Sequence, residues 1–82
     1  MTVTPGPQLS RRAAHKLQSL MLESAGGEEE DETERMTLYR KAAFEEMSAW
    51  AWSQADEDLA RVHALLEKAG GVDPEDVMKE FL

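Results

Sequence analysis

The chain of 82 residues has no Cys, and this absence excludes a disulfide scaffold, a thiolate metal site and a Cys nucleophile. It also has no run of about 18 apolar residues, so we expect no segment to span a membrane. Residues 1–7 lack the basic-then-apolar pattern of a signal peptide, and the expected compartment is therefore the cytoplasm. A chain of this length corresponds to one domain.

β-Branched residues are scarce as well. Ile is absent, and from Gln8 onward only five residues are Val or Thr, against 11 Ala and 9 Leu in the whole chain. Strands favour β-branched and aromatic side chains, whereas Ala and straight-chain residues lose little freedom in a helix. The composition predicts an all-α fold, a small hairpin or bundle of three to four helices that is completed by oligomerisation.

The spacing of apolar residues predicts helices over about residues 8–24, 33–52, 54–69 and 74–82, after a flexible lead-in at residues 1–7. In the first helix, one apolar stripe is expected to face the rest of the protein, with a basic group off the stripe. The stripe consists of Leu9, Ala13, Leu17, Leu20, Met21 and Ser24, and the basic group of Arg11, Arg12, His15 and Lys16. Gly26 and Gly27, after Ala25, are expected to end this helix, because glycine readily adopts the left-handed conformation of a helix C-cap.

No Gly or Pro interrupts residues 33–69, so this segment forms either one continuous helix or two helices. Asp31, with Glu34 three residues further on, predicts the N-cap of the first part. The apolar stripe shifts around the helix near Trp52, and Ser53 with Asp56 has the spacing of an internal capping box. These two features favour a break within residues 52–56.

The last segment has the clearest helix-start signal. Asp73 is expected at the N-cap and Pro74 at the first helical position, after Gly70 has ended the preceding helix. Val72 and Val77 are placed to form a hydrophobic staple. A helix of two turns is not stable by itself, so this one must dock on the core or on a partner.

Residues suited to catalysis or metal binding are few. The two His, His15 and His63, lie in different predicted helices, and neither follows a Glu by three positions as in a di-iron bundle. The glycine pairs at 26–27 and 70–71 are not followed by Lys and Ser or Thr, so they do not form phosphate loops. We therefore expect a non-enzymatic protein without a catalytic residue, a cofactor or a metal site.

Two tryptophans indicate contact with another chain. Trp50 and Trp52 point about 160° apart on one helix, and a chain this short has too little material to bury both. We predict a protein–protein interaction module, such as an adaptor, an assembly factor or a regulatory subunit, that forms a homodimer. The predicted interface consists of Trp50, Trp52, Leu59, Val62, Leu66, Met78 and Phe81.

The charge is acidic, with a net value of −8, and it is unevenly placed. Residues 28–82 hold 6 basic and 16 acidic residues, so this part repels nucleic acid and suits a basic protein surface. We expect Glu28, Glu29 and Glu30 either to face such a partner or only to solvate the chain.

Two alternative functions follow from the charges. The first is an acidic inhibitor that fills a basic nucleic-acid-binding groove of a target protein, which requires the acids of residues 28–32, 56–58 and 73–76 to lie on one surface. The second is a small DNA-binding regulator whose contacts come from the basic group of the first helix, Arg11, Arg12, His15 and Lys16.

Overall fold

The computed structural model describes the backbone of residues 7–82 and the side chains from Ser10 onward. These residues form four helices and no strand: α1 (Pro7–Glu28), α2 (Glu32–Ser53), α3 (Asp56–Lys68) and α4 (Pro74–Phe81). The all-α prediction is therefore confirmed. The predicted lead-in lies outside the described residues except for Pro7, which begins α1, and so does the side chain of Leu9. None of the four helices is both long enough and apolar enough to cross a lipid bilayer.

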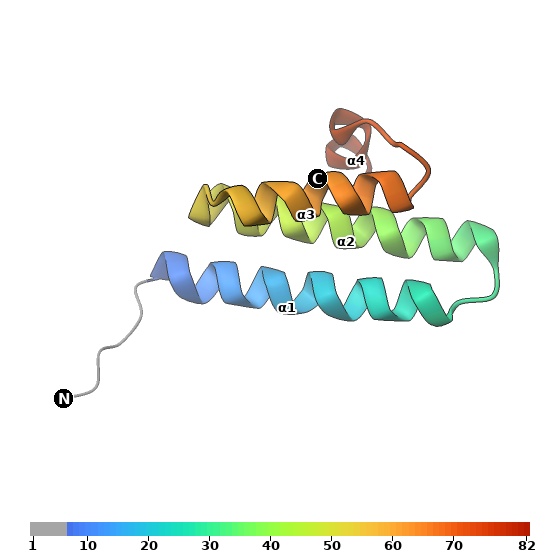
Figure 1. The fold of residues 1–82 in the computed structure, drawn as a ribbon, viewed down its shortest axis with the longest axis horizontal. Helices are drawn as coiled ribbons and strands as arrows, with labels where there is room; N and C mark the ends of the chain where they lie inside the picture. Colours follow the sequence, from blue (N-terminus) through green and yellow to red (C-terminus); the bar gives the residue numbers. More distant parts are fainter. Residues whose placement is uncertain (1–6) are drawn as a thin grey trace.

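Helix α2 is the central element of the fold (Figure 1). Helix α1 runs antiparallel to α2, and α3 and α4 both pack on α2, with α3 also facing α1. The apolar core lies among α2, α3 and α4. Its buried residues are Ala42, Ala43, Val62, Leu65, Leu66 and Val77, and around them pack Leu22, Phe44, Met47, Val72 and Phe81.

Three helix ends agree with the prediction. The carboxylate of Asp31 accepts hydrogen bonds from the backbone N–H groups of Thr33 and Glu34, and that of Asp73 caps α4 by accepting from the Glu75 N–H. Gly70 has a φ of 99° and follows the last residues of α3. Its N–H and that of Gly71 bond back to carbonyls of α3, which closes the helix in a Schellman motif.

The segment 33–69 is two helices rather than one. Gln54 takes the left-handed conformation, with a φ of 56°, and turns the chain between α2 and α3. The N-cap of α3 is Ala55 and not the predicted Ser53, and the Ala55 side chain has no oxygen to accept a bond. Ser53 acts beside the cap instead, because its hydroxyl accepts from the Ala55 N–H and donates to Asp58.

The prediction that Gly26 and Gly27 end the first helix is wrong, because α1 continues through them to Glu28. The structure gives Gly26 a different role. A Cβ atom at this position would lie 2.7 Å from Cε1 of Tyr39 on α2, so any larger residue would require the Tyr39 ring to shift. Close packing explains this glycine better than chain termination does.

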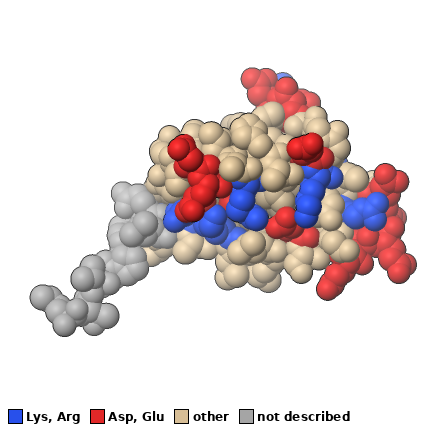
Figure 2. Space-filling model, in the orientation of Figure 1, with Lys and Arg blue, Asp and Glu red and all other residues tan. Residues whose placement is uncertain are grey.

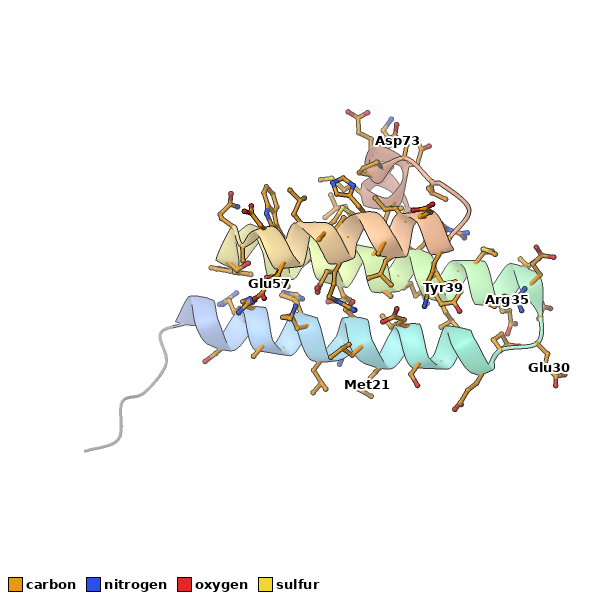
Figure 3. All side chains as sticks on the ribbon, viewed as in Figure 1. Met21, Glu30, Arg35, Tyr39, Glu57 and Asp73 are labelled. Atoms are coloured by element: carbon orange, nitrogen blue, oxygen red, sulfur yellow. The ribbon has the colours of Figure 1, made fainter. Side chains whose placement is uncertain are left out.

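The expectation that the apolar stripe of α1 faces the protein is also wrong. Leu17, Leu20 and Met21 are 58%, 49% and 57% exposed, and Met21 points away from the other helices (Figure 3). The opposite face of α1 packs on α2, where the buried Ser19 hydroxyl donates to the Ala42 carbonyl at 3.0 Å. That face is polar, and it faces α2 and α3 because charges on those helices complement it.

Candidate functional site

An apolar groove with a volume of about 390 Å³ lies among α2, α3 and α4. Nine of its eleven lining residues are apolar, and Ser48 and His63 are the polar ones. The lining consists of Phe44, Met47, Ser48, Trp50 and Ala51 from α2, Leu59, Val62 and His63 from α3, and Pro74, Met78 and Leu82 from the C-terminal segment. A volume in this range is typical of sites that take up apolar groups of a ligand.

Helix α4 forms one wall of the groove because it is anchored along its other side. Val77 is completely buried, and the rings of Phe44 and Phe81 lie 5.7 Å apart between α2 and α4. Arg40 adds an ion pair with Glu80, with its Nε 2.8 Å from Oε1. These contacts hold α4 in place and leave Met78, which is 44% exposed, on the groove side.

The seven predicted interface residues divide into three sets. Trp50, Leu59, Val62 and Met78 come together in the groove, although Val62 is only 4% exposed. Leu66 and Phe81 pack within the chain itself, with Leu66 5% exposed. Trp52 is separate from the groove.

Trp52 lies on another face of α2, as the angle between the two tryptophans requires. Its indole is 39% exposed, and the guanidinium carbon of Arg11 lies 5.1 Å from the ring centroid. This is a cation–π contact between α1 and α2. Trp52 therefore has a partner within the chain, a partner that apolar periodicity does not reveal.

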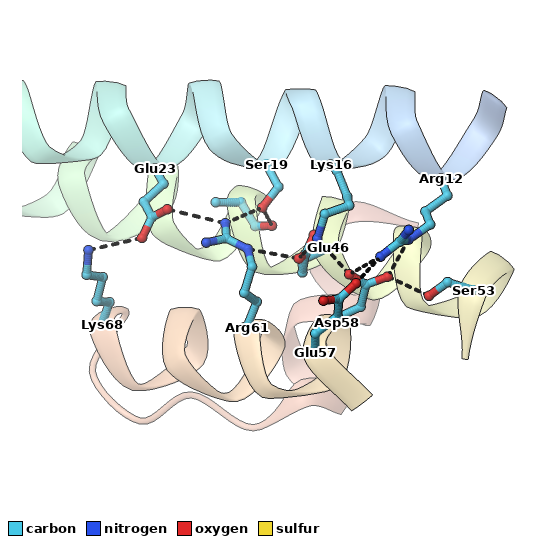
Figure 4. Close-up of polar contacts among 11 residues, drawn as sticks. Arg12, Lys16, Ser19, Glu23, Glu46, Ser53, Glu57, Asp58, Arg61 and Lys68 are labelled. Carbon is cyan, nitrogen blue, oxygen red and sulfur yellow. Dashed lines mark hydrogen bonds and ion pairs between the residues drawn. The ribbon is translucent and has the colours of Figure 1, made fainter. Parts of the chain in front are cut away.

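Eight charged side chains form a network that joins α1, α2 and α3 (Figure 4). Its members are Arg12, Lys16 and Glu23 from α1, Glu46 from α2, and Glu57, Asp58, Arg61 and Lys68 from α3. Asp58 is central, with its Oδ2 2.8 Å from Arg12 Nε and its Oδ1 2.6 Å from Lys16 Nζ. The positive and negative members are equal in number, so the net charge of the network is zero.

The titration of this network fits a structural role. Asp58 is completely buried, yet the hydrogen bond from Arg12, with those from Lys16 and Ser53, holds its pKa well below the ordinary value of 3.8. The same bond to Asp58 raises the pKa of Arg12. Burial alone would lower the pKa of Lys16, but the bonds to Asp58 and Glu46 outweigh burial and raise it. These groups are charged at neutral pH and are not poised to transfer protons.

The basic group of α1 is engaged within the chain. Arg12 and Lys16 pair with carboxylates of the network, and Nδ1 of His15 lies 2.6 Å from Oε2 of Glu45. Figure 2 shows blue Lys and Arg atoms in a band across the molecule, with red acidic atoms beside them. Neighbouring carboxylates therefore offset the positive potential on which the DNA-binding alternative depends.

The acidic residues are spread over the molecule. Glu30, Glu57 and Asp73 lie in the α1–α2 loop, at the start of α3 and at the start of α4, three separate places in Figure 3. Helix α2 separates the first two, and its 22 residues span about 33 Å. The inhibitor alternative needs these acids on one surface, and in the structure they form three separated groups rather than one continuous acidic surface (Figures 2 and 3).

The acidic run itself has a partly local role. The Glu29 carboxylate accepts from the Asp31 N–H, and its carbonyl accepts from Arg35, so Glu29 helps to order the turn before α2. Glu28 and Glu30 are exposed.

The part of the chain that the structure describes holds no cluster of three or more His, Asp or Glu side chains suited to a metal ion. His15 lies between α1 and α2, and His63 lines the groove. The groove is therefore the best candidate for a binding site among the described residues.

No known family, curated protein or solved structure matches the chain.

Proposed function

We propose that the protein is a non-enzymatic protein–protein interaction module, an adaptor, assembly factor or regulatory subunit, and that its groove binds an amphipathic helix of a partner protein. The observation that carries the proposal is the groove itself, in which Trp50, Leu59 and Met78 leave apolar surface open among three helices. The chain has no Cys, so its fold does not depend on disulfides, and this suits the reducing cytoplasm in which we expect it to act.

The shape and chemistry of the groove favour a helix as its ligand. An apolar groove between helices accepts the side chains that an amphipathic helix presents at every third and fourth position. Asp56 and Glu67 are exposed and lie three and four positions from the lining residues Leu59 and His63 on α3. A partner with Lys or Arg beside its apolar side chains would complement these acids.

The test uses the emission of Trp50, because Trp52→Phe leaves it as the only indole in the chain. The probe is a synthetic amphipathic helix with Leu on one face and Lys on the other. We expect its binding to shift the Trp50 emission to shorter wavelength, since the peptide would cover an indole that is now half-buried.

Two variants in the Trp52→Phe background separate the groove from general attraction between opposite charges. Met78→Glu places a carboxylate in the groove, and we expect binding to weaken by roughly 10-fold or more despite the added negative charge. Ala64→Glu adds the same charge at an exposed position of α3 outside the lining, and should leave binding unchanged or slightly stronger. Equal binding by the two variants, or no emission change with any of the proteins, would refute the proposal.

A further inference from the structure

The outward side of α1 carries a continuous surface without a charged residue. This surface, called here the outer face of α1, consists of Ser10, Ala13, Ala14, Leu17, Leu20, Met21 and Ser24, all of them exposed. Three large apolar side chains lie together at its centre, and each is about half exposed. Single exposed apolar residues are ordinary, but a contiguous apolar patch on a helix is typical of an interaction surface.

We propose that the outer face of α1 pairs with the outer face of a second copy of this chain, with the two α1 helices antiparallel. An interface with two-fold symmetry brings the same residues together from both copies. If Leu17 of one copy lies opposite Leu20 of the other, then Ala13 lies opposite Ser24. The large side chains then meet at the centre of the interface, with small side chains on both sides.

The distribution of charge selects the antiparallel direction. A parallel pair would bring together the acidic runs of both copies at residues 28–32, which repel each other. In the antiparallel pair the two runs are separated by the length of α1, about 33 Å for its 22 residues. That separation exceeds the screening length of about 8 Å at physiological ionic strength.

The antiparallel pair also brings opposite charges together. Each acidic run would approach the first turns of the partner's α1, which carry Arg11 and the positive end of the helix dipole. The charge difference between the two ends of α1 is thus complementary to a second copy of the chain.

This surface is distinct from the groove. Helix α1 lies on one side of α2, and the groove opens among α2, α3 and α4 (Figure 1). The dimer would therefore leave both grooves accessible, and its existence does not depend on the proposed helix-binding function.

The first test measures the mass of the full chain in solution by sedimentation equilibrium. We expect the wild-type chain to form a dimer, and Leu20→Glu to weaken self-association by roughly 100-fold or more, because the dimer would bury two carboxylates near its axis. Gln18→Glu is the matched control, since it adds the same charge to an exposed position of α1 outside the outer face, and it should remain dimeric. Leu20 is half exposed, so circular dichroism should show unchanged helix content in Leu20→Glu.

Three results would overturn the proposal: a wild-type chain that sediments as a monomer throughout, a Leu20→Glu variant that stays dimeric, or a Gln18→Glu variant that dissociates with it. Met78→Glu, which blocks the groove, should leave the dimer intact. If Met78→Glu dissociates the dimer and Leu20→Glu does not, the second copy binds at the groove and not at α1.

The second test determines the direction of the helices by crosslinking, and the natural absence of Cys makes it unambiguous. A mixture of Ala13→Cys and Ser24→Cys chains should form a disulfide between the two variants, because these positions face each other in the antiparallel pair. Ala13→Cys alone should crosslink poorly. Efficient crosslinking of Ala13→Cys with itself would indicate a parallel pair and would contradict the proposed geometry.

Discussion

Replacing Asp58 with Asn should destabilise the protein strongly at neutral pH. The carboxylate is completely buried and accepts hydrogen bonds from Arg12, Lys16 and Ser53. Asn has nearly the same shape, but it carries no charge to balance the two cations. Removing one partner of a buried ion pair costs about 3–5 kcal/mol, because the remaining charge stays uncompensated.

The side chains of Arg12 and Lys16 are 25% and 27% exposed, so water would replace part of what they lose. We therefore expect Asp58→Asn to lower the free energy of unfolding by about 2–4 kcal/mol. A domain of 82 residues has a total stability of roughly 4–12 kcal/mol. The substitution should therefore remove a large share of the total free energy of unfolding.

The loss should depend on pH in a defined direction. The pKa of Asp58 is lower in the folded protein than its ordinary value of 3.8, so its stabilisation is present above about pH 4 and is lost as the pH falls below that value. One group that binds a proton only in the unfolded state lowers stability by about 1.4 kcal/mol per pH unit. The difference between wild type and Asp58→Asn should therefore shrink by about that amount for each unit below pH 3.8.

Urea denaturation followed by circular dichroism at pH 7, pH 3 and pH 2 measures this difference. All proteins are compared at one concentration, because the proposed self-association would add to stability. Asp56→Asn is the control, since it makes the same chemical change at an exposed position of α3. It should cost less than about 1 kcal/mol. A loss below about 1 kcal/mol for Asp58→Asn at pH 7, or a loss that is the same at pH 2, would refute the reasoning.

Three further predictions concern packing and helix ends. Gly27→Ala should raise the free energy of unfolding by about 0.5–1 kcal/mol through helix propensity. Gly26→Ala should lower the free energy of unfolding by about 1–2 kcal/mol, because the added Cβ would meet Tyr39. Changes of the same sign in calorimetry of the two variants would contradict the assigned role of Gly26. Asp73→Ala removes the carboxylate that accepts from the Glu75 N–H, so it should lower the free energy of unfolding by about 1 kcal/mol and increase amide hydrogen exchange first in α4. Unchanged exchange in α4 would argue against this capping. Leu65→Ala, at a site 1% exposed, should lower the free energy of unfolding in urea by about 2–5 kcal/mol. Leu82→Ala, at a site 85% exposed, should lower it by less than about 0.5 kcal/mol. Similar losses for the two variants would mean that the core does not lie at Leu65.

Local signals in the sequence predict the N-terminal ends of α2 and α4 well, because these ends depend on nearby residues. Asp31 and Asp73 cap the N–H groups two or three positions further along, so sequence spacing alone is sufficient. Gly26 shows where such reasoning fails. Its local preference is to end a helix, but the ring of Tyr39 on the neighbouring helix determines its role.

The candidate site was predictable only in part, for a related reason. Trp50, Leu59 and Met78 belong to apolar stripes that the sequence displays, and they do meet in the groove. Leu66 belongs to the same stripe as Leu59 and lies at nearly the same angle around α3, about two turns further along, yet it is buried in the core. Which part of the stripe remains open depends on where α4 docks, and that is set by tertiary contacts such as the one between Phe44 and Phe81.

Helix α1 gives the most instructive departure from the prediction. The sequence displays its apolar stripe, but the prediction places the stripe on the wrong side, because a polar face is normally assumed to be the solvated one. Here the polar face carries Arg12 and Lys16, which find buried acceptors in Asp58 and Glu46, so the desolvation of these charges is offset by specific pairs. Within one chain this leaves Leu17, Leu20 and Met21 in contact with water, a loss of hydrophobic stabilisation that grows with every Å² left exposed. A helix with one face matched by ion pairs and the other apolar has two surfaces suited to packing. The residues that the structure describes cover only the first, so the second is the place where association with another copy would contribute most to stability.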